Sequence, residues 1–409
     1  MRSILRVIGC VLGLWLLAGP AVAEPYFAVR EGLKCSACHT NMNGGGKRTD
    51  LVSTHARDIL HYPSFFGAFS NPPDFFTGEI NKYVSVGADL RASNSAVFQD
   101  LGSHTQCSQR IQNGSPTAVC VDNNEVFRGR LDKDRIEMTE AVVYGELRLI
   151  PDYLTLYVDE RFQPTTDNRE AFGLLRNVLP WNGFLKAGQM FLPYGLQLQD
   201  DEAFIRGGRK SPSSSMTSGF SFNKEEPAFE AGFEPGPFTF ILAVSDGSAD
   251  DRDVRVTGTA SALVADLPVV RNVLVGSSFS RVGPPNTETV IFGFFCGTNI
   301  ERFTFLAEAD FRNDRTQATD GRNTGRFIAY GEGDYLLFDW LNLKATVDYS
   351  DSDGRLGDTM DSENRVSVGL EPFLNRFMQT RLFYRVNNGI STDATHNQNV
   401  LFAEVHLFL

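Results

Sequence analysis

Long hydrophobic runs and an excess of positive charge are both missing from most of this chain. After residue 23, no stretch approaches the roughly 18 consecutive apolar residues that a membrane-spanning helix requires. Its 38 Lys and Arg residues are outnumbered by 50 Asp and Glu residues, which gives a formal net charge of −12. This acidic balance, with no basic patch interleaved with aromatic residues, excludes a typical nucleic-acid-binding protein.

Familiar catalytic motifs are also missing. The chain has neither a Gly-x-Ser-x-Gly nucleophile motif nor a phosphate-binding glycine loop, and it shows no reaction-competent triad. These absences argue against a conventional enzyme of these classes, and they leave open activities that a bound cofactor would supply.

Residues 1–23 have the pattern of a secretory signal peptide. Arg2 and Arg6 supply the positive charge at the start, residues 4–18 are almost wholly apolar, and Ala21 and Ala23 are the small residues that a signal peptidase reads. The apolar stretch is short for a retained membrane anchor, the alternative interpretation. We therefore expect cleavage before Glu24 and export to an oxidising compartment.

A c-type haem attachment motif, Cys-x-x-Cys-His, follows shortly after the predicted cleavage point. Two thiols at this spacing each form a thioether to a haem vinyl group, and the adjacent histidine ligates the iron. A zinc site would require further Cys or His ligands nearby, and a redox dithiol would require a thioredoxin-like context. We expect one haem c, with Cys35 and Cys38 as covalent anchors and His39 as proximal ligand.

The second axial ligand of the iron is open from sequence. His55 is the first candidate and His61 the second, and an open or water-bound iron is the third alternative. The glycine triplet at residues 44–46 would allow the chain to fold back over the haem. Lys47 and Arg48 are candidates for pairing with the haem propionates.

From about Ile80, apolar and polar residues alternate. Charged residues on one face and aliphatic residues on the other, over about 9–11 residues, are typical of transmembrane β-strands. The pattern predicts about sixteen strands, which start near residues 80, 136, 154, 168, 183, 228, 237, 252, 273, 288, 301, 325, 341, 364, 377 and 399.

The connections between these strands alternate between short turns and longer polar segments. This layout is typical of outer-membrane barrels, with short turns in the periplasm and long loops outside. The sequence thus predicts an all-β fold: an antiparallel transmembrane β-barrel of about sixteen strands with a small N-terminal haem module. The predicted divisions are a signal peptide (1–23), a monohaem cytochrome c module with linker (24–78) and a porin-like barrel (79–409). A soluble β-sandwich or solenoid is the alternative.

Three further features lie in the predicted barrel. Cys107 and Cys120 share the first long loop and are a candidate disulfide. Cys296 is expected to be an inert buried thiol within a strand. The acidic residues 200–202 would line a pore constriction or, as the simpler interpretation, belong to a solvated loop.

Residues 27–39 carry a family resemblance. The stretch Phe27-Ala28-Val29-Arg30-Glu31-Gly32-Leu33-Lys34-Cys35-Ser36-Ala37-Cys38-His39 resembles the start of the fused outer-membrane monohaem cytochrome–porins, which include the outer-membrane cytochrome iron oxidases. Residues 183–206 resemble anion-type porins. The resemblance implies electron transfer across the outer membrane, with Cys35, Cys38 and His39 as the haem-binding residues.

Three functions follow as hypotheses. The first is electron transfer across the outer membrane between a periplasmic cytochrome and extracellular Fe(II), Fe(III) or another redox metal, with the haem module in the barrel lumen. The second is an outer-membrane solute porin whose periplasmic haem module acts as a redox gate or partner dock. The third is a haem-dependent enzyme with an open iron site. Porin-like oligomers are compatible with all three.

Overall fold

The computed structural model describes most of the exported chain. The described residues are 24–49, 76–101, 105–112, 115–122, 127–163, 166–198, 200, 202–207, 225–246, 254–283, 288–314, 324–351, 362–375, 377–388 and 398–409. Side chains between residues 99 and 135 lie outside this description, as do residues 1–23 and the linker at 50–75.

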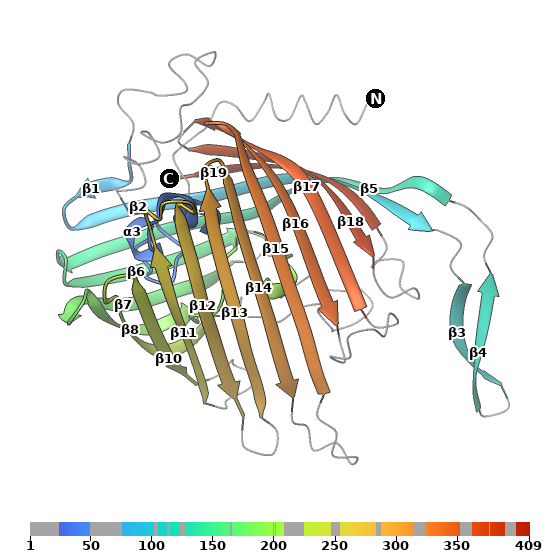
Figure 1. Cartoon of the computed structure of the whole chain (residues 1–409), viewed down its shortest axis with the longest axis horizontal. Helices are drawn as coiled ribbons and strands as arrows, with labels where there is room; N and C mark the ends of the chain where they lie inside the picture. Colours follow the sequence, from blue (N-terminus) through green and yellow to red (C-terminus); the bar gives the residue numbers. More distant parts are fainter. Residues whose placement is uncertain are drawn as a thin grey trace.

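Sixteen antiparallel strands of the described chain close into one barrel (Figure 1). Each strand pairs with its neighbour in sequence, and the last strand pairs with the first through eleven residue pairs from Gln398↔Gln99 to Phe408↔Asp89. The barrel strands are β2 (Val84–Leu101), β5 (Phe127–Ile150), β6 (Leu154–Gln163), β7 (Asp167–Leu179), β8 (Gly183–Phe191), β9 (Glu225–Phe233), β10 (Phe238–Ser245), β11 (Arg255–Val264), β12 (Asn272–Val282), β13 (Thr289–Ile300), β14 (Phe303–Asp314), β15 (Thr324–Phe338), β16 (Leu341–Asp351), β17 (Ser362–Asn375), β18 (Met378–Asn388) and β19 (Gln398–Phe408).

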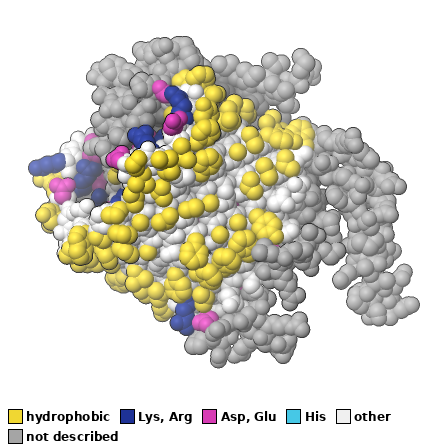
Figure 2. Space-filling model, in the orientation of Figure 1, with side chains coloured by type: hydrophobic (Ala, Val, Ile, Leu, Met, Phe, Trp, Pro, Cys, Tyr) yellow, Lys and Arg dark blue, Asp and Glu magenta, His cyan; other side chains and the backbone are white. Residues whose placement is uncertain are grey.

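The predicted alternation maps onto the two faces of the barrel wall. In β6, Tyr157 and Asp159 are almost fully buried toward the lumen, while Leu156 and Val158 are exposed. Figure 2 shows the resulting apolar outer surface, with side chains of this kind spread across the strands. An apolar exterior around a polar interior is the arrangement of an outer-membrane barrel. Among the described residues, no helix is long and apolar enough to cross a membrane.

The first strands differ in detail from the prediction. Near residue 80, where one strand was expected to begin, the short strand β1 (Glu79–Asn81) forms a hairpin with β2. The strand expected near residue 136 begins at Phe127, because β5 extends along the full length of β2. The expected long first loop contains a separate hairpin of β3 (Thr105–Gln112) and β4 (Ser115–Asp122).

The expectation that Cys296 is a buried thiol is wrong. It lies on the outer face of β13, where its side chain is exposed rather than buried in a protein core. Its neighbours along the strand explain this, because Phe294 also points outward while Phe295 points into the barrel. The outward face of β13 is covered by lipid in a membrane, not by protein.

Residues 24–49, called the plug below, lie inside the barrel. They include helices α2 (Pro25–Glu31) and α3 (Cys35–Cys38). In Figure 1, α3 lies within the barrel toward the end that carries the C-terminus. Lys34 places the plug at the short-turn end, because its ammonium donates to the carbonyls of Gly236 and Phe238 at the β9–β10 turn, at 2.9 and 2.8 Å.

Candidate functional site

The plug is attached to two separate parts of the lumen wall. At the first, the Asn272 amide donates to the carbonyls of Val29 and Arg30 at the end of α2, at 2.8 and 2.7 Å. Gly32 then turns the chain with φ +67°, a conformation that favours glycine. A side chain at this position would also meet Ala265 of the wall at 2.9 Å. Close packing against the wall thus ends α2 and directs the chain toward Cys35.

At the second part of the wall, a buried polar network holds the residues after the motif. The Lys186 ammonium lies 2.8 Å from a Glu230 oxygen, and neither side chain is exposed to solvent. Lys186 also donates to the Asn41 side-chain oxygen at 3.1 Å, and the Asn43 amide donates to Glu230 at 2.7 Å. Asn41 donates in turn to Glu170 at 2.9 Å. The inward faces of β7, β8 and β9 therefore hold the plug in place.

The Cys-x-x-Cys-His motif forms one turn of helix, and the chain after it reverses and pairs with His39 at Arg48. α3 contains both cysteines, and the His39 amide donates to the Cys35 carbonyl at 3.0 Å. The glycines at 44–46 all have positive φ, at 90°, 76° and 62°, and reverse the chain. Thr49 then donates its amide to the Cys38 carbonyl at 3.0 Å. The triplet reverses the chain, which then returns alongside the motif.

A second segment also enters the lumen. The described part of residues 192–207, called the inner loop, follows β8 and includes the short helix η3 (Phe204–Arg206). The Leu196 amide donates to Glu308 at 2.6 Å, and the Phe204 amide donates to Asp348 at 2.9 Å. Leu196 and Phe204 belong to the same buried apolar cluster as Tyr26 of the plug. The plug and the inner loop therefore form one packed body within the barrel.

The acidic part of the inner loop contacts the barrel wall. Asp200 accepts from Arg365 and Arg385 at 3.1 and 2.8 Å, and Glu202 accepts from Arg385 at 2.8 Å. The simpler expectation of a solvated loop is wrong for Asp200, because the wall arginines draw it inward, whereas the side chain of Glu202 stays 55% exposed. Asp201 lies outside the described residues.

A cavity of about 410 Å³ lies between the plug, the inner loop and the wall. We call it the chamber. Its plug side carries the motif residues Cys35, Cys38 and His39. Its lining includes the apolar residues Phe27, Leu198, Ile241, Leu263, Leu274 and Phe295 and the arginines Arg48, Arg91, Arg161 and Arg169. The carboxylates of Asp89 and Glu140 also line it, and they pair with Arg91 at 3.1 and 3.0 Å.

The three motif side chains differ in their accessibility and in their electrostatic environment. The Cys35 side chain is accessible from the chamber, although burial inside the barrel raises the pKa of its thiol to about 11. Burial, with the positive charge of Arg48, lowers the pKa of His39 to about 3, so its imidazole is neutral, the form that binds metals. Its Nδ1 is buried without a hydrogen-bond partner. The donors present therefore fit a haem c.

The two candidates for pairing with propionates differ. Lys47 is buried and lies 3.4 Å from Glu79 and 3.5 Å from Glu146, so its charge is already balanced. Arg48 stacks on Phe408, with 4.3 Å between its guanidinium carbon and the ring centroid, and its buried Nε has no hydrogen-bond partner. Arg48 also lines the chamber. It is the better placed of the two to meet an anionic group.

The remaining predicted site residues have different outcomes. His55 and His61 lie outside the described residues, so the second axial ligand stays a prediction. Cys107 and Cys120 are cross-strand partners in the backbone register of β3 and β4, while their side chains lie outside the description. Their disulfide also stays a prediction. Within the described ranges, no group of three or more His, Cys, Asp or Glu residues forms a separate metal site.

Sequence reasoning did not identify the residues that hold the plug. Asn272, Lys186 and Glu230 carry most of this attachment, and Arg176 adds a contact from its guanidinium to the Thr40 carbonyl. Their only signal in the sequence is a polar residue at an inward position of a strand, which every lumen residue shares.

Solved structures with a similar fold are outer-membrane porins. In-vitro folded OmpT of Vibrio cholerae has a TM-score of 0.53 at 10% identity, over 81% of this chain and 99% of that one. Salmonella typhi OmpF in complex with daunomycin has a TM-score of 0.52 at 10% identity, over 81% and 99%. An anion-selective porin from Comamonas acidovorans has a TM-score of 0.50 at 8% identity, over 80% and 99%. No protein-family model and no curated protein matches this chain. At these identities the likeness establishes a porin-like outer-membrane barrel fold.

Proposed function

We propose that this chain is an outer-membrane barrel that carries one haem c in its lumen and passes electrons through the barrel. The observation that supports this proposal is the position of Cys35, Cys38 and His39, which line the chamber inside the barrel. Bound there, the haem would supply a one-electron iron centre. The donors and acceptors that we propose are a periplasmic cytochrome and extracellular Fe(II), Fe(III) or another redox metal.

Distance supports a position in the lumen. A bilayer is about 40–45 Å thick with its headgroups, and one haem attached outside the barrel would leave nearly all of that span uncrossed. A haem in the chamber would lie between the two membrane surfaces, so that electrons would cross the bilayer in two shorter steps. The plug and inner loop would hold the ring, exclude bulk water from it and orient its anionic edge toward Arg48, while His39 would hold the iron.

The proposal is tested on intact cells that express the protein. A ferric or ferrous complex that cannot cross the outer membrane is added, and the haem absorbance bands are followed. A rapid redox change that is lost in Cys38→Ala but kept in Ser36→Ala supports electron transfer through the barrel. Ser36 is a matched control because it lies in the same helical turn, where its hydroxyl hydrogen-bonds Glu234. A haem that responds only after the outer membrane is permeabilised contradicts the proposal.

A solute porin with a haem gate is the second candidate, and the fold favours it. The similar structures are porins, and the inner loop narrows the lumen with the facing charges of Asp200, Arg365 and Arg385. Single-channel conductance in a planar bilayer distinguishes the two functions. Steady ion conductance that changes with the redox state of the haem supports the gate. Conductance at the background level favours the electron pathway.

A further inference from the structure

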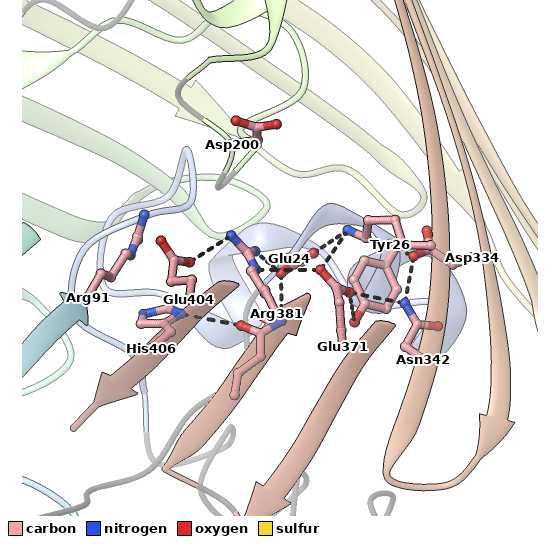
Figure 3. Close-up of polar contacts among 12 residues, drawn as sticks. Glu24, Tyr26, Arg91, Asp200, Asp334, Asn342, Glu371, Arg381, Glu404 and His406 are labelled. Carbon is pink, nitrogen blue, oxygen red and sulfur yellow. Dashed lines mark hydrogen bonds and ion pairs between the residues drawn. The ribbon is translucent and has the colours of Figure 1, made fainter. Parts of the chain in front are cut away.

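A buried group of carboxylates around Glu24 has too few cations. The Lys344 ammonium lies 2.6 Å from Glu24, 3.4 Å from Glu332, 3.8 Å from Asp334 and 3.6 Å from Glu371. Arg381 pairs with Glu24 and lies 3.5 Å from Glu371. Figure 3 shows Glu24, Glu371 and Arg381 turned toward one another in the lumen. Four carboxylates thus share two cations.

Two individual carboxylate oxygens show this shortage of positive charge. Glu332 Oε1 and Asp334 Oδ2 are buried and have no hydrogen-bond partner, and both side chains are more than nine-tenths buried. Arg381 cannot supply the missing charge alone, because it also lies 3.4 Å from Glu404. An uncompensated buried carboxylate costs several kcal/mol, so a further positive group or protons must be present.

The structure also shows where that group would fit. A small cavity of about 30 Å³ lies beside the cluster, and it is lined by the carboxylates Glu24, Asp200, Glu332 and Glu371 and by the cations Lys344, Arg381 and Arg385, with Pro25 among the other lining residues. About 10–15 Å³ is enough to hold a water-sized group. Glu24, one of the residues that border this cavity, would be the first residue of the mature chain after the predicted cleavage.

We propose that the cluster around Glu24 is a binding site for the chain's own N-terminal ammonium, which exists only after the signal peptide is removed. A signal peptidase adds water across the Ala23–Glu24 amide. Ala23 leaves with a carboxylate, and Glu24 keeps an α-amino group that takes up a proton. This ammonium enters the cavity, where it pairs with Glu332 and Glu371. Signal cleavage therefore completes the ion cluster that fixes the plug in the lumen, and the inference does not depend on a haem.

The test is N-terminal labelling of the full-length barrel purified in detergent. The probe is N-hydroxysuccinimidyl acetate, which acylates free α-amines, and mass spectrometry of the N-terminal peptide measures the rate. We expect a peptide that begins at Glu24. Its labelling should be at least about tenfold slower in the folded barrel than in denatured protein, the factor that one charge-assisted hydrogen bond supplies.

Two variants separate charge from simple burial. Glu371→Gln keeps the packing but removes a charge beside the cavity, and we expect it to raise the labelling rate of the folded barrel severalfold. Glu226→Gln is the control, because Glu226 pairs with Arg255 on a different part of the wall and should leave the rate unchanged. A mature terminus other than Glu24, labelling of the folded barrel at the denatured rate, or equal rates in Glu371→Gln and Glu226→Gln would overturn the proposal.

Discussion

The ion pair between Lys186 of β8 and Glu230 of β9 is the part of the plug's attachment whose energy is most directly predictable. Both residues also hydrogen-bond the plug, through Asn41 and Asn43. The two charged atoms are 2.8 Å apart, and both side chains are fully buried. At an effective dielectric constant of about 20, their attraction is about 6 kcal/mol, most of which offsets the cost of removing both charges from water. Lys186→Ala would leave the Glu230 carboxylate buried without its cation and would also remove the bond to Asn41. We expect it to lower the free energy of unfolding by about 3–5 kcal/mol.

The assay is equilibrium unfolding of the barrel in detergent with guanidinium chloride, followed by tryptophan fluorescence. Arg302→Ala is the control, because its pair with Asp339 at 3.3 Å has both side chains substantially exposed and should contribute about 1 kcal/mol or less. The double variant Lys186→Met with Glu230→Gln should recover much of the loss, since no charge remains buried. A loss below about 1 kcal/mol in Lys186→Ala would refute the argument that this pair is desolvated.

Three further predictions concern the inner loop, the plug and the outer face. Gly195 and Gly236 both have φ +58°, but a Cβ would meet Glu308 at 1.9 Å only at Gly195, so Gly195→Ala should displace the inner loop and lower the unfolding midpoint more than Gly236→Ala does. Burial raises the pKa of Glu24, but ion pairs with Lys344 and Arg381 outweigh this and hold it well below 4.5, so its contribution to stability is complete above pH 4.5 and is lost as the pH falls further. Unfolding midpoints measured between pH 6 and pH 3 should therefore fall less steeply in Glu24→Gln than in the parent chain, and parallel curves would rule this out. Cys296 should resist a charged maleimide in lipid vesicles and react after denaturation in SDS; reaction in intact vesicles would place it outside the lipid-covered surface.

The strands could be predicted from sequence because a membrane barrel imposes the same period on every strand. Lipid on one side and a polar lumen on the other require alternation, and starts such as Leu154, Gly183 and Leu341 coincide with β6, β8 and β16. The start of β5 was missed by nine residues. Its first part, residues 127–135, is polar and pairs with β2 through the backbone, which leaves no apolar face for a sequence pattern to detect.

The sequence left the motif either in the lumen or at the periplasmic mouth, and the wall residues that hold the plug could not be predicted. The spacing of Cys35, Cys38 and His39 defines the motif locally, whereas the lumen position depends on contacts between distant residues. Asn272 is 243 positions from Val29, and Lys344 is 320 positions from Glu24. Each of these wall residues resembles any other polar residue facing the lumen. The expected burial of the Cys296 side chain was wrong for a related reason. An outward-facing residue of a barrel strand is covered by lipid rather than by protein.

The most direct test of electron transfer through the barrel uses liposomes that contain the purified protein. A reduced soluble c-type cytochrome is enclosed, and a ferric chelate coupled to dextran is added outside, so that neither partner passes through a pore. The account predicts oxidation of the enclosed cytochrome with the parent chain and with Ser36→Ala, and none with Cys35→Ala or Cys38→Ala. No oxidation with the parent chain, or oxidation that persists without the two cysteines, would contradict it.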